Sequence, residues 1–246
     1  MNTSFRLHSG DQAPRQTTPT TCGAACLTVA RMLVDPPFAR WIIAGEGRPV
    51  GAPDGATEAE RFSAYEAVVQ RRTNAFRAPD GRPSLPWPRS LGTPPWGARR
   101  ELEAGAARRG LDYDIVPIRA DSATTLRRRH ARLVELVEDG VPALLYVGSR
   151  TLPRHVTLVL PGDGDSYLDV YDPYTGQVTL LDDRRFASGR LGLAGWDLPW
   201  VLVQPSERKP ILDTVGDLVR DALPRPMPHG GHVTTSEVSP TRGARG

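Results

Sequence analysis

The stretch RQTTPTTCGAACL, Arg15–Leu27, holds both cysteines of a chain of 246 residues, and they stand four positions apart. From Cys22 onward, apolar residues recur at helical spacing in CGAACLTVARMLV, and the threonines and proline before them are typical of a helix start. We therefore expect Cys22 in the first turn of a helix, and Cys26 one turn further along inside an apolar face.

The two cysteines admit three interpretations: a metal clip, a disulfide, or one reactive thiol beside a buried one. A structural zinc site needs four ligands, and the five histidines are scattered along the chain. A disulfide between successive turns of one helix is hard to build in relaxed geometry. We favour the third interpretation, with Cys26 as a small buried hydrophobe and Cys22 where a helix N-terminus stabilises a thiolate. No metal and no cofactor are expected.

The composition is that of a globular protein, 39% hydrophobic, with a formal net charge of +3 from 31 basic and 28 acidic residues. No basic stretch is interleaved with aromatic residues, so we expect no nucleic-acid partner. No apolar run approaches the ~20 residues that a membrane span needs, and the N-terminus lacks the apolar core of a signal peptide. We expect a cytoplasmic protein with no membrane partner, and leave secretion by a signal-less route open.

The chain divides into three parts. Residues 1–10 are expected to be flexible, and residues 11–205 to form one domain that carries a Pro- and Gly-rich insertion at about 45–97. In residues 206–246, the segment ILDTVGDLVRDAL is typical of an amphipathic helix, and the rest has the Pro, Gly and Ser content of a disordered tail.

Helix signals come first along the domain and strand signals later. Helices are predicted from the Thr57/Glu60 capping box to about residue 72, from 98 to 109 before Gly110, and from 121 or 122 to about 139. Strands are predicted in YDIVPI, VPALLYVG, HVTLVL, YLDVYD, QVTLL and WVLV. This order predicts the α+β class.

A nucleophilic thiolate needs a base, a group that orients the base, and donors for the oxyanion. Gln16, six residues before Cys22, could supply a donor beside the Cys22 backbone N–H. His155 opens the predicted hairpin HVTLVLPGDGDSYLDVYDPYTG, whose tightest turn signal is Asp163-Gly164. A two-residue loop there puts His155 directly opposite Asp172, with Cβ atoms ~5 Å apart, so that the carboxylate can hold the imidazole in one tautomer.

Each of these residues also has a plainer interpretation when taken alone. Gln16 could be a solvated loop residue, His155 a half-buried strand residue, and Asp172 a turn former. The rival histidine His130 lies in RRRHARL, where we expect a solvated side chain on a basic helical face. Only the combination indicates a thiol-dependent active site.

The combination resembles the papain-like cysteine peptidases, and most closely the bacterial branch that cleaves the double-glycine leader peptides of bacteriocins. The separation of 133 positions from Cys22 to His155 lies in the ~130 to 150 range of papain-type enzymes. Such leader peptidases are usually fused to a transporter, whereas this chain shows no membrane span, so we expect a stand-alone protein. The matching residues are Gln16, Cys22-Gly23, Cys26, His155 and Asp172-Pro173.

The resemblance implies a papain-like fold, in which an N-terminal helix carrying Cys22 packs on a C-terminal antiparallel sheet. It implies a cysteine peptidase acting on a peptide or protein substrate, with Gly23 as an expected substrate contact. Apart from the resemblance, Trp87 and Trp96 in the Pro-rich stretches SLPWPRS and TPPWGAR could line the substrate cleft or could pin their loop to the core. The same thioacyl chemistry also serves deamidases, transglutaminases and acyltransferases, and a fold of this kind can persist as a non-catalytic interaction module. The sequence leaves these alternatives open.

Overall fold

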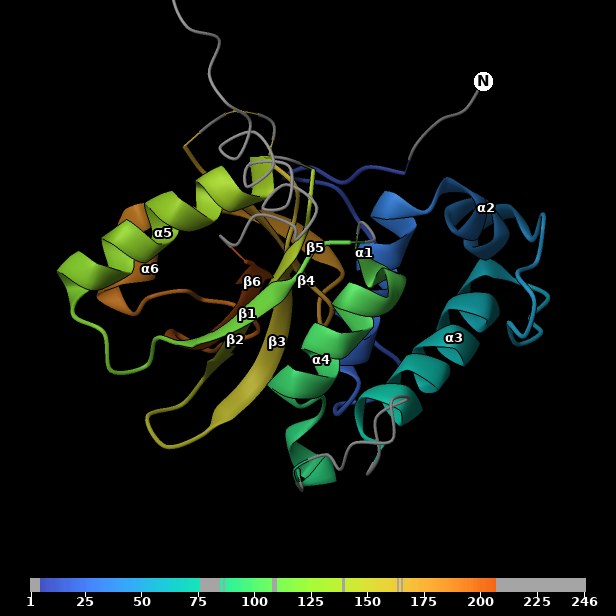
Figure 1. The fold of residues 1–246 in the computed structure, drawn as a ribbon, viewed down its shortest axis with the longest axis horizontal. Helices are drawn as coiled ribbons and strands as arrows, with labels where there is room; N and C mark the ends of the chain where they lie inside the picture. The colour runs from blue at the N-terminus through green and yellow to red at the C-terminus, as the bar shows by residue number, and fades with distance from the viewer. Residues whose placement is uncertain are drawn as a thin grey trace, which may run out of the picture. The chain divides into compact units, whose positions relative to one another are not determined.

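Six strands form one antiparallel sheet in the order β1-β6-β2-β3-β4-β5, and helices cover both of its faces (Figure 1). The computed structural model describes residues 5–75, 85, 87–107, 110–138, 140–162, 164 and 166–206. The strands are β1 Tyr113–Pro117, β2 Ala143–Gly148, β3 Pro153–Val159, β4 Leu168–Asp172, β5 Gln177–Leu181 and β6 Leu198–Pro205. The predicted α+β class is confirmed.

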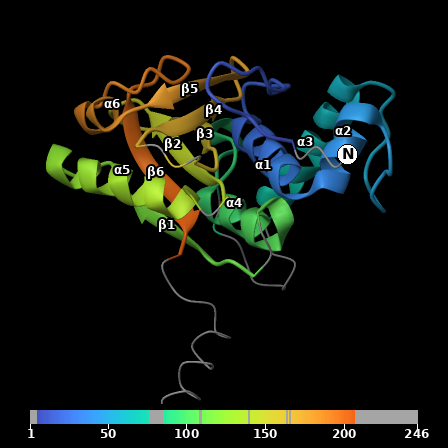
Figure 2. The same ribbon diagram turned by 90° about the horizontal axis from the view of Figure 1, so that it is seen from above.

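The sheet separates two hydrophobic clusters because successive side chains of a strand point to opposite faces. In β2, Leu144 and Tyr146 belong to one cluster, while Leu145 and Val147 belong to the other. Buried residues of α1 Cys22–Val34, α2 Pro36–Ala44, α3 Glu58–Thr73 and α4 Pro95–Glu101 make up most of the first cluster. Helices α5 Ala123–Glu138 and α6 Asp183–Ser188 supply the second, and Figure 2 shows these two helices on the opposite side from α1–α4.

Helix α3 confirms the capping-box prediction. The Thr57 hydroxyl accepts from the Glu60 N–H at 3.2 Å, and the Glu60 carboxylate accepts from the Thr57 N–H at 3.2 Å. Although α3 lies within the region predicted as a Pro- and Gly-rich insertion, it packs directly against α1, whose other side packs against β3. The insertion therefore contributes a helix to the layer that carries Cys22.

Other helix boundaries differ from the prediction. The helix expected at 98–109 begins at Pro95 and continues after Glu101 as a π-helical turn, Leu102–Ala106, in which Gly105 has a φ of 138°. Helix α2 was not predicted, although Asp35 caps it by accepting from the Phe38 N–H at 3.1 Å. Helix α6 was not predicted either, since its six residues are too few for a periodic signal.

Residues 5–10, which belong to the segment expected to be flexible, make defined contacts with the rest of the domain. Leu7 is buried in the first cluster, and the Gly10 N–H donates to Val178 O at 3.1 Å. A bridge between Gln12 and Gln177 continues this pairing, so the N-terminal segment runs along the outer edge of β5. Residues 1–4, the predicted helix at 211–223 and the predicted tail lie outside the described residues.

Among the described helices, none has the length and apolar character that a membrane span requires. The predicted cellular location stays a prediction.

Candidate active site

Cys22 is the first residue of α1, as predicted, and is 3% exposed. The turn before it closes on itself, because the Thr21 hydroxyl donates to Thr18 O at 2.9 Å and accepts from the Thr18 N–H at 3.1 Å. With that hydroxyl engaged in the turn, no side chain among the described residues caps α1. The first N–H groups of the helix therefore have no capping side chain as a partner. Their partial positive charge favours negative charge near the Cys22 sulfur.

His155 and Asp172 meet in the interior, with His155 Nε2 2.8 Å from Asp172 Oδ1. His155 is 6% exposed and Asp172 4%, so water competes little for this hydrogen bond. The Tyr174 N–H donates to the same carboxylate oxygen at 2.9 Å and helps to fix its orientation. The pairing expected from the sequence is therefore present.

The strand register that brings them together differs from the predicted one. A two-residue loop at Asp163-Gly164 would pair Leu158 with Asp169, whereas Leu158 pairs with Tyr171. The Leu160 N–H donates to Asp169 O at 2.9 Å, so the connection is two residues longer than predicted. A shift of two residues keeps every side chain on its face of the sheet, and Asp172 is the diagonal neighbour of His155 rather than its direct partner.

Cys22 is the second partner of the His155 ring. Because Nε2 is engaged with Asp172, Nδ1 is the ring nitrogen available for the hydrogen bond between His155 and the Cys22 thiol. Cys26, one turn along α1, places its sulfur 3.5 Å from Val156 O. The contact of Cys26 with the neighbour of His155 helps to keep α1 aligned along β3.

Burial shifts the pKa of His155 downward, but the hydrogen bonds and negative charges of Asp172 and Cys22 outweigh it and raise the pKa to about 9. Burial likewise raises the pKa of Asp172, and here the hydrogen bond and charge of His155 prevail, so the pKa falls below its ordinary value. At neutral pH the pair is an imidazolium held by a carboxylate. The positive charge of the imidazolium faces the Cys22 side chain.

Gln16 is fixed near the site by its backbone and not by its side chain. The Gln16 N–H donates to Pro173 O at 2.8 Å, which ties the loop before Cys22 to the residue after Asp172. The side-chain nitrogen donates to Thr18 O at 2.8 Å, and Gln16 Oε1 is buried with no hydrogen-bond partner among the described residues. The role of Gln16 as an oxyanion donor stays a prediction.

Gly23 packs against the last part of the insertion, just before α4. A Cβ at Gly23 would lie 2.5 Å from Thr93 Cβ, so no larger residue fits without a shift of Thr93. The neighbouring Gly92 has a φ of 71°, and a Cβ there would lie 3.7 Å from the Cys22 sulfur. The segment around Gly92 therefore borders the sulfur. Substrate contact by Gly23 stays a prediction.

Trp87 and Trp96, the other predicted substrate contacts, meet edge to face with ring centroids 5.2 Å apart. Both are half-buried and lie on either side of the segment that borders Cys22. Trp87 Nε1 is buried with no hydrogen-bond partner among the described residues. The contact of this pair with substrate stays a prediction.

The interpretation of His130 as a solvated residue is wrong. His130 is 3% exposed, its Nε2 lies 3.0 Å from Leu181 O, and its ring packs on Phe186 at 5.7 Å between centroids. The arginines around it in the sequence conceal that it falls on the buried stripe of α5, the helix that covers the second cluster. His130 is therefore not a rival candidate for the catalytic base.

Sequence reasoning missed three polar residues that contact the segments around Cys22: Glu66, Gln70 and Tyr146. The Tyr146 hydroxyl donates to Thr93 O at 3.1 Å, and burial raises the pKa of this phenol well above its usual value. Glu66 and Gln70 lie on α3 and contact the loop before Cys22. Helical spacing places Glu66 between Phe62 and Val69 on the buried face, and a carboxylate in such a stripe was the available signal.

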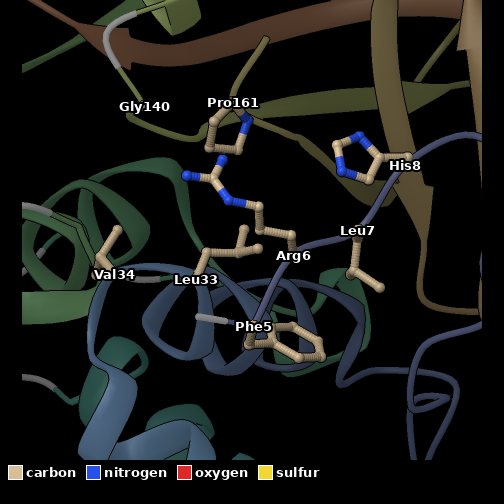
Figure 3. Close-up of a pocket in the computed structure, with 8 residues that line it drawn as sticks. All are labelled: Phe5, Arg6, Leu7, His8, Leu33, Val34, Gly140 and Pro161. Atoms are coloured by element: carbon tan, nitrogen blue, oxygen red, sulfur yellow. The ribbon is translucent and has the colours of Figure 1, made fainter. Parts of the chain in front are cut away.

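A pocket at the far end of α1 is separate from this site. It is lined by residues of the N-terminal segment, by Leu33 and Val34 at the C-terminal end of α1, and by Gly140 and Pro161. Figure 3 shows the Arg6 side chain extended past Leu33 toward Pro161. Cys22 lies twelve residues back along α1, roughly 18 Å away at the rise of an α-helix.

Both cysteines are free thiols. Within the described part of the chain, no cluster of three or more His, Cys, Asp or Glu side chains could hold a metal ion.

No protein-family profile matches the chain, and no curated protein matches it. Among solved structures, the chain is similar to the crystal structure of the peptidase domain of Streptococcus ComA, a bi-functional ABC transporter involved in a quorum-sensing pathway. The match has 16% sequence identity, covers 79% of this chain and 98% of that one, and has a TM-score of 0.37. A likeness this distant does not assign a family, so the functional argument rests on the geometry of the site.

Proposed function

We propose that the protein is a thiol-dependent hydrolase with a papain-like fold, and that it is a cysteine peptidase cleaving a peptide or isopeptide bond. The observation that carries this proposal is the buried chain of contacts from the Cys22 thiol through the His155 ring to the Asp172 carboxylate, with 2.8 Å between His155 and Asp172. Such an arrangement supports the proposed roles of nucleophile, base and group that orients the base.

In the proposed reaction, the Cys22 thiolate attacks the carbonyl carbon and forms a C–S bond, while the carbonyl oxygen takes the negative charge. The N–H groups at the start of α1 and the Gln16 amide are the candidate donors for that oxygen. His155 then gives its proton to the departing nitrogen as the C–N bond breaks, leaving a thioester. His155 next removes a proton from water, which attacks the thioester and releases the acid and the Cys22 thiolate.

Asp172 acts on the base and not on the substrate. It accepts a hydrogen bond from His155 Nε2 and thereby directs Nδ1 toward the sulfur. Its negative charge stabilises the imidazolium that the thiolate requires as a partner. The protein would thus need no metal or cofactor for the acyl transfer.

Incubation with a peptide library and reading of product masses tests the proposal. We expect new termini with the wild-type protein and with Cys26→Ser, and none with Cys22→Ser. A mass increase of about one unit without cleavage would assign deamidation in place of hydrolysis. Equal loss of activity in both cysteine variants, with metal released on unfolding, would revive the metal clip.

A further inference from the structure

The loop that joins Gln16 to Cys22 has few anchors of its own. Its internal contacts, from Thr21 to Thr18 and from Gln16 to Thr18, hold its shape but not its place in the molecule. On the side of the sheet, the Gln16 N–H is bound to Pro173 O, next to the residue that orients His155. The opposite side of the loop faces α3.

Glu66 of α3 binds the beginning of this loop. It is 1% exposed, and the Thr17 N–H donates to both of its carboxylate oxygens at 3.2 Å. The Thr17 hydroxyl donates to Oε2 as well. Burial raises the pKa of Glu66, and the hydrogen bonds from Thr17 act in the opposite direction. A carboxylate that accepts three hydrogen bonds from one residue holds the backbone beside Gln16 firmly.

Gln70, one helical turn further along α3, binds the end of the loop. Its side-chain nitrogen donates to Thr20 O at 3.2 Å, and its Oε1 accepts from the Thr93 hydroxyl at 3.2 Å. Thr93 O accepts in turn from Tyr146. The same Thr20 carbonyl is the atom closest to the missing Cβ of Gly92, at 3.0 Å. Gln70 therefore links the loop before Cys22 to the segment that borders its sulfur.

We propose that Glu66 and Gln70 are positioning residues that hold the Gln16–Cys22 loop in register with His155, an inference that rests on the proposed function. Residues four apart on a helix share a face, so one rigid face of α3 fixes both ends of the loop. The hydrogen bonds of both side chains go to Thr17, Thr20 and Thr93. Each acts through the loop, and a displacement of about 1 Å in such a loop can cost ~10²-fold in rate.

The substitution Glu66→Gln tests the first contact because it turns one acceptor oxygen into a donor that faces the donors of Thr17. We expect kcat to fall by roughly tenfold or more while KM changes little, since the binding surface for substrate is kept. The substitution Gln70→Ala should act in the same direction. Glu58→Gln and Arg71→Ala, exposed residues on the same helix, are matched controls with unchanged kcat.

If Glu66→Gln fails to fold, a second pair of variants tests the same contact from the side of Thr17. Thr17 is exposed, so Thr17→Val removes only the hydroxyl, and Thr17→Ser keeps it. We expect Thr17→Val to lower kcat and Thr17→Ser to keep a kcat close to that of the wild type. Both are measured well below the unfolding temperature. A merely structural role would alter the melting temperature without this split between kcat and KM.

The outcomes separate the two proposals. Suppose that the wild-type protein cleaves peptides and that kcat is unchanged in Glu66→Gln, Gln70→Ala and Thr17→Val. This result would overturn the positioning role and leave the proposed function standing. If the wild-type protein cleaves no peptide and its Cys22 does not react with a thiol-directed probe, the proposed function is overturned. The positioning role is then overturned as well.

Discussion

Two thiols four residues apart on α1 have different environments. Cys26 is fully buried, and burial raises the pKa of its thiol well above the usual value, with the nearby Cys22 adding to the effect. Its S–H group is directed at Val156 O. Cys22 instead meets the His155 ring at the open start of the helix. Position along one helix thus separates an inert thiol from a candidate nucleophile.

The pH dependence of kcat/KM should show the elevated pKa of His155. The imidazolium persists below the pKa of about 9 and is lost as the pH rises through it, so activity should fall on an alkaline limb near pH 9. Asp172→Asn removes the negative charge that raises this pKa. We expect the alkaline limb to move down by roughly one to three units in that variant. An alkaline limb near the ordinary histidine pKa in the wild type would contradict the assignment.

The candidate site was predictable at the level of residue identity more than of geometry. The spacing of Cys22, His155 and Asp172 predicted the contact between His155 and Asp172, which is present, but the hairpin register was predicted two residues off. The error did not separate His155 from Asp172 because strand side chains alternate with a period of two. An error of one residue would have placed them on opposite faces. The roles of Gln16 and of the other site residues stay predictions.

At the scale of elements, the contact between α1 and the segment before α4 depends on the absence of a side chain at Gly23. Its missing Cβ would lie 2.5 Å from Thr93 Cβ and 2.7 Å from the Thr93 hydroxyl oxygen. Helix α1 can therefore approach this segment closely only because residue 23 is glycine. The approach brings Gly92 beside the Cys22 sulfur.

Gly23→Ala should lower the free energy of unfolding by about 1–3 kcal/mol because it overfills this contact, and it should also slow turnover. Since the clash is with Thr93 Cβ itself, Thr93→Gly should relieve it in the double variant, whereas Thr93→Ala should not. Denaturant unfolding of the single and double variants measures this coupling. A Gly23→Ala protein as stable as the wild type would show that the contact is looser than described.

Some elements could not be predicted from local patterns. The insertion at 45–97 was expected to be a Pro- and Gly-rich addition to the domain, yet its helix α3 supports the loop of Cys22 through Glu66 and Gln70. Helical periodicity shows which face of α3 is buried, but it does not show which loop that face meets. That partner is set by tertiary packing between segments about 50 residues apart.

At the scale of the whole molecule, the candidate site lies where the helical layer meets the sheet. Cys22 belongs to α1, and His155 and Asp172 belong to β3 and β4. The N-terminal segment links the two parts, because it pairs with the outer edge of β5 and then leads directly into the loop of Gln16. The site therefore depends on the edge of the sheet as well as on its centre.

Deleting residues 1–13 should destabilise the protein and expose the edge of β5. The deletion removes the burial of Leu7 and the backbone hydrogen bonds of Gly10, Asp11 and Ala13 with the β5 edge. Together these contribute about 4 kcal/mol, which corresponds to a melting temperature lower by roughly 10 °C. Thermal unfolding and size-exclusion chromatography measure both effects, with deletion of residues 1–4 as the control. A melting temperature equal to the control would contradict this role.

The rate at which iodoacetamide alkylates each cysteine at neutral pH, resolved by peptide mass spectrometry, tests the central claim most directly. We predict that Cys22 reacts at least about tenfold faster than an ordinary free thiol, that Cys26 in the folded protein does not react, and that His155→Ala removes the advantage of Cys22. A Cys22 that reacts no faster than an ordinary thiol, or whose rate is unchanged by His155→Ala, would contradict the account.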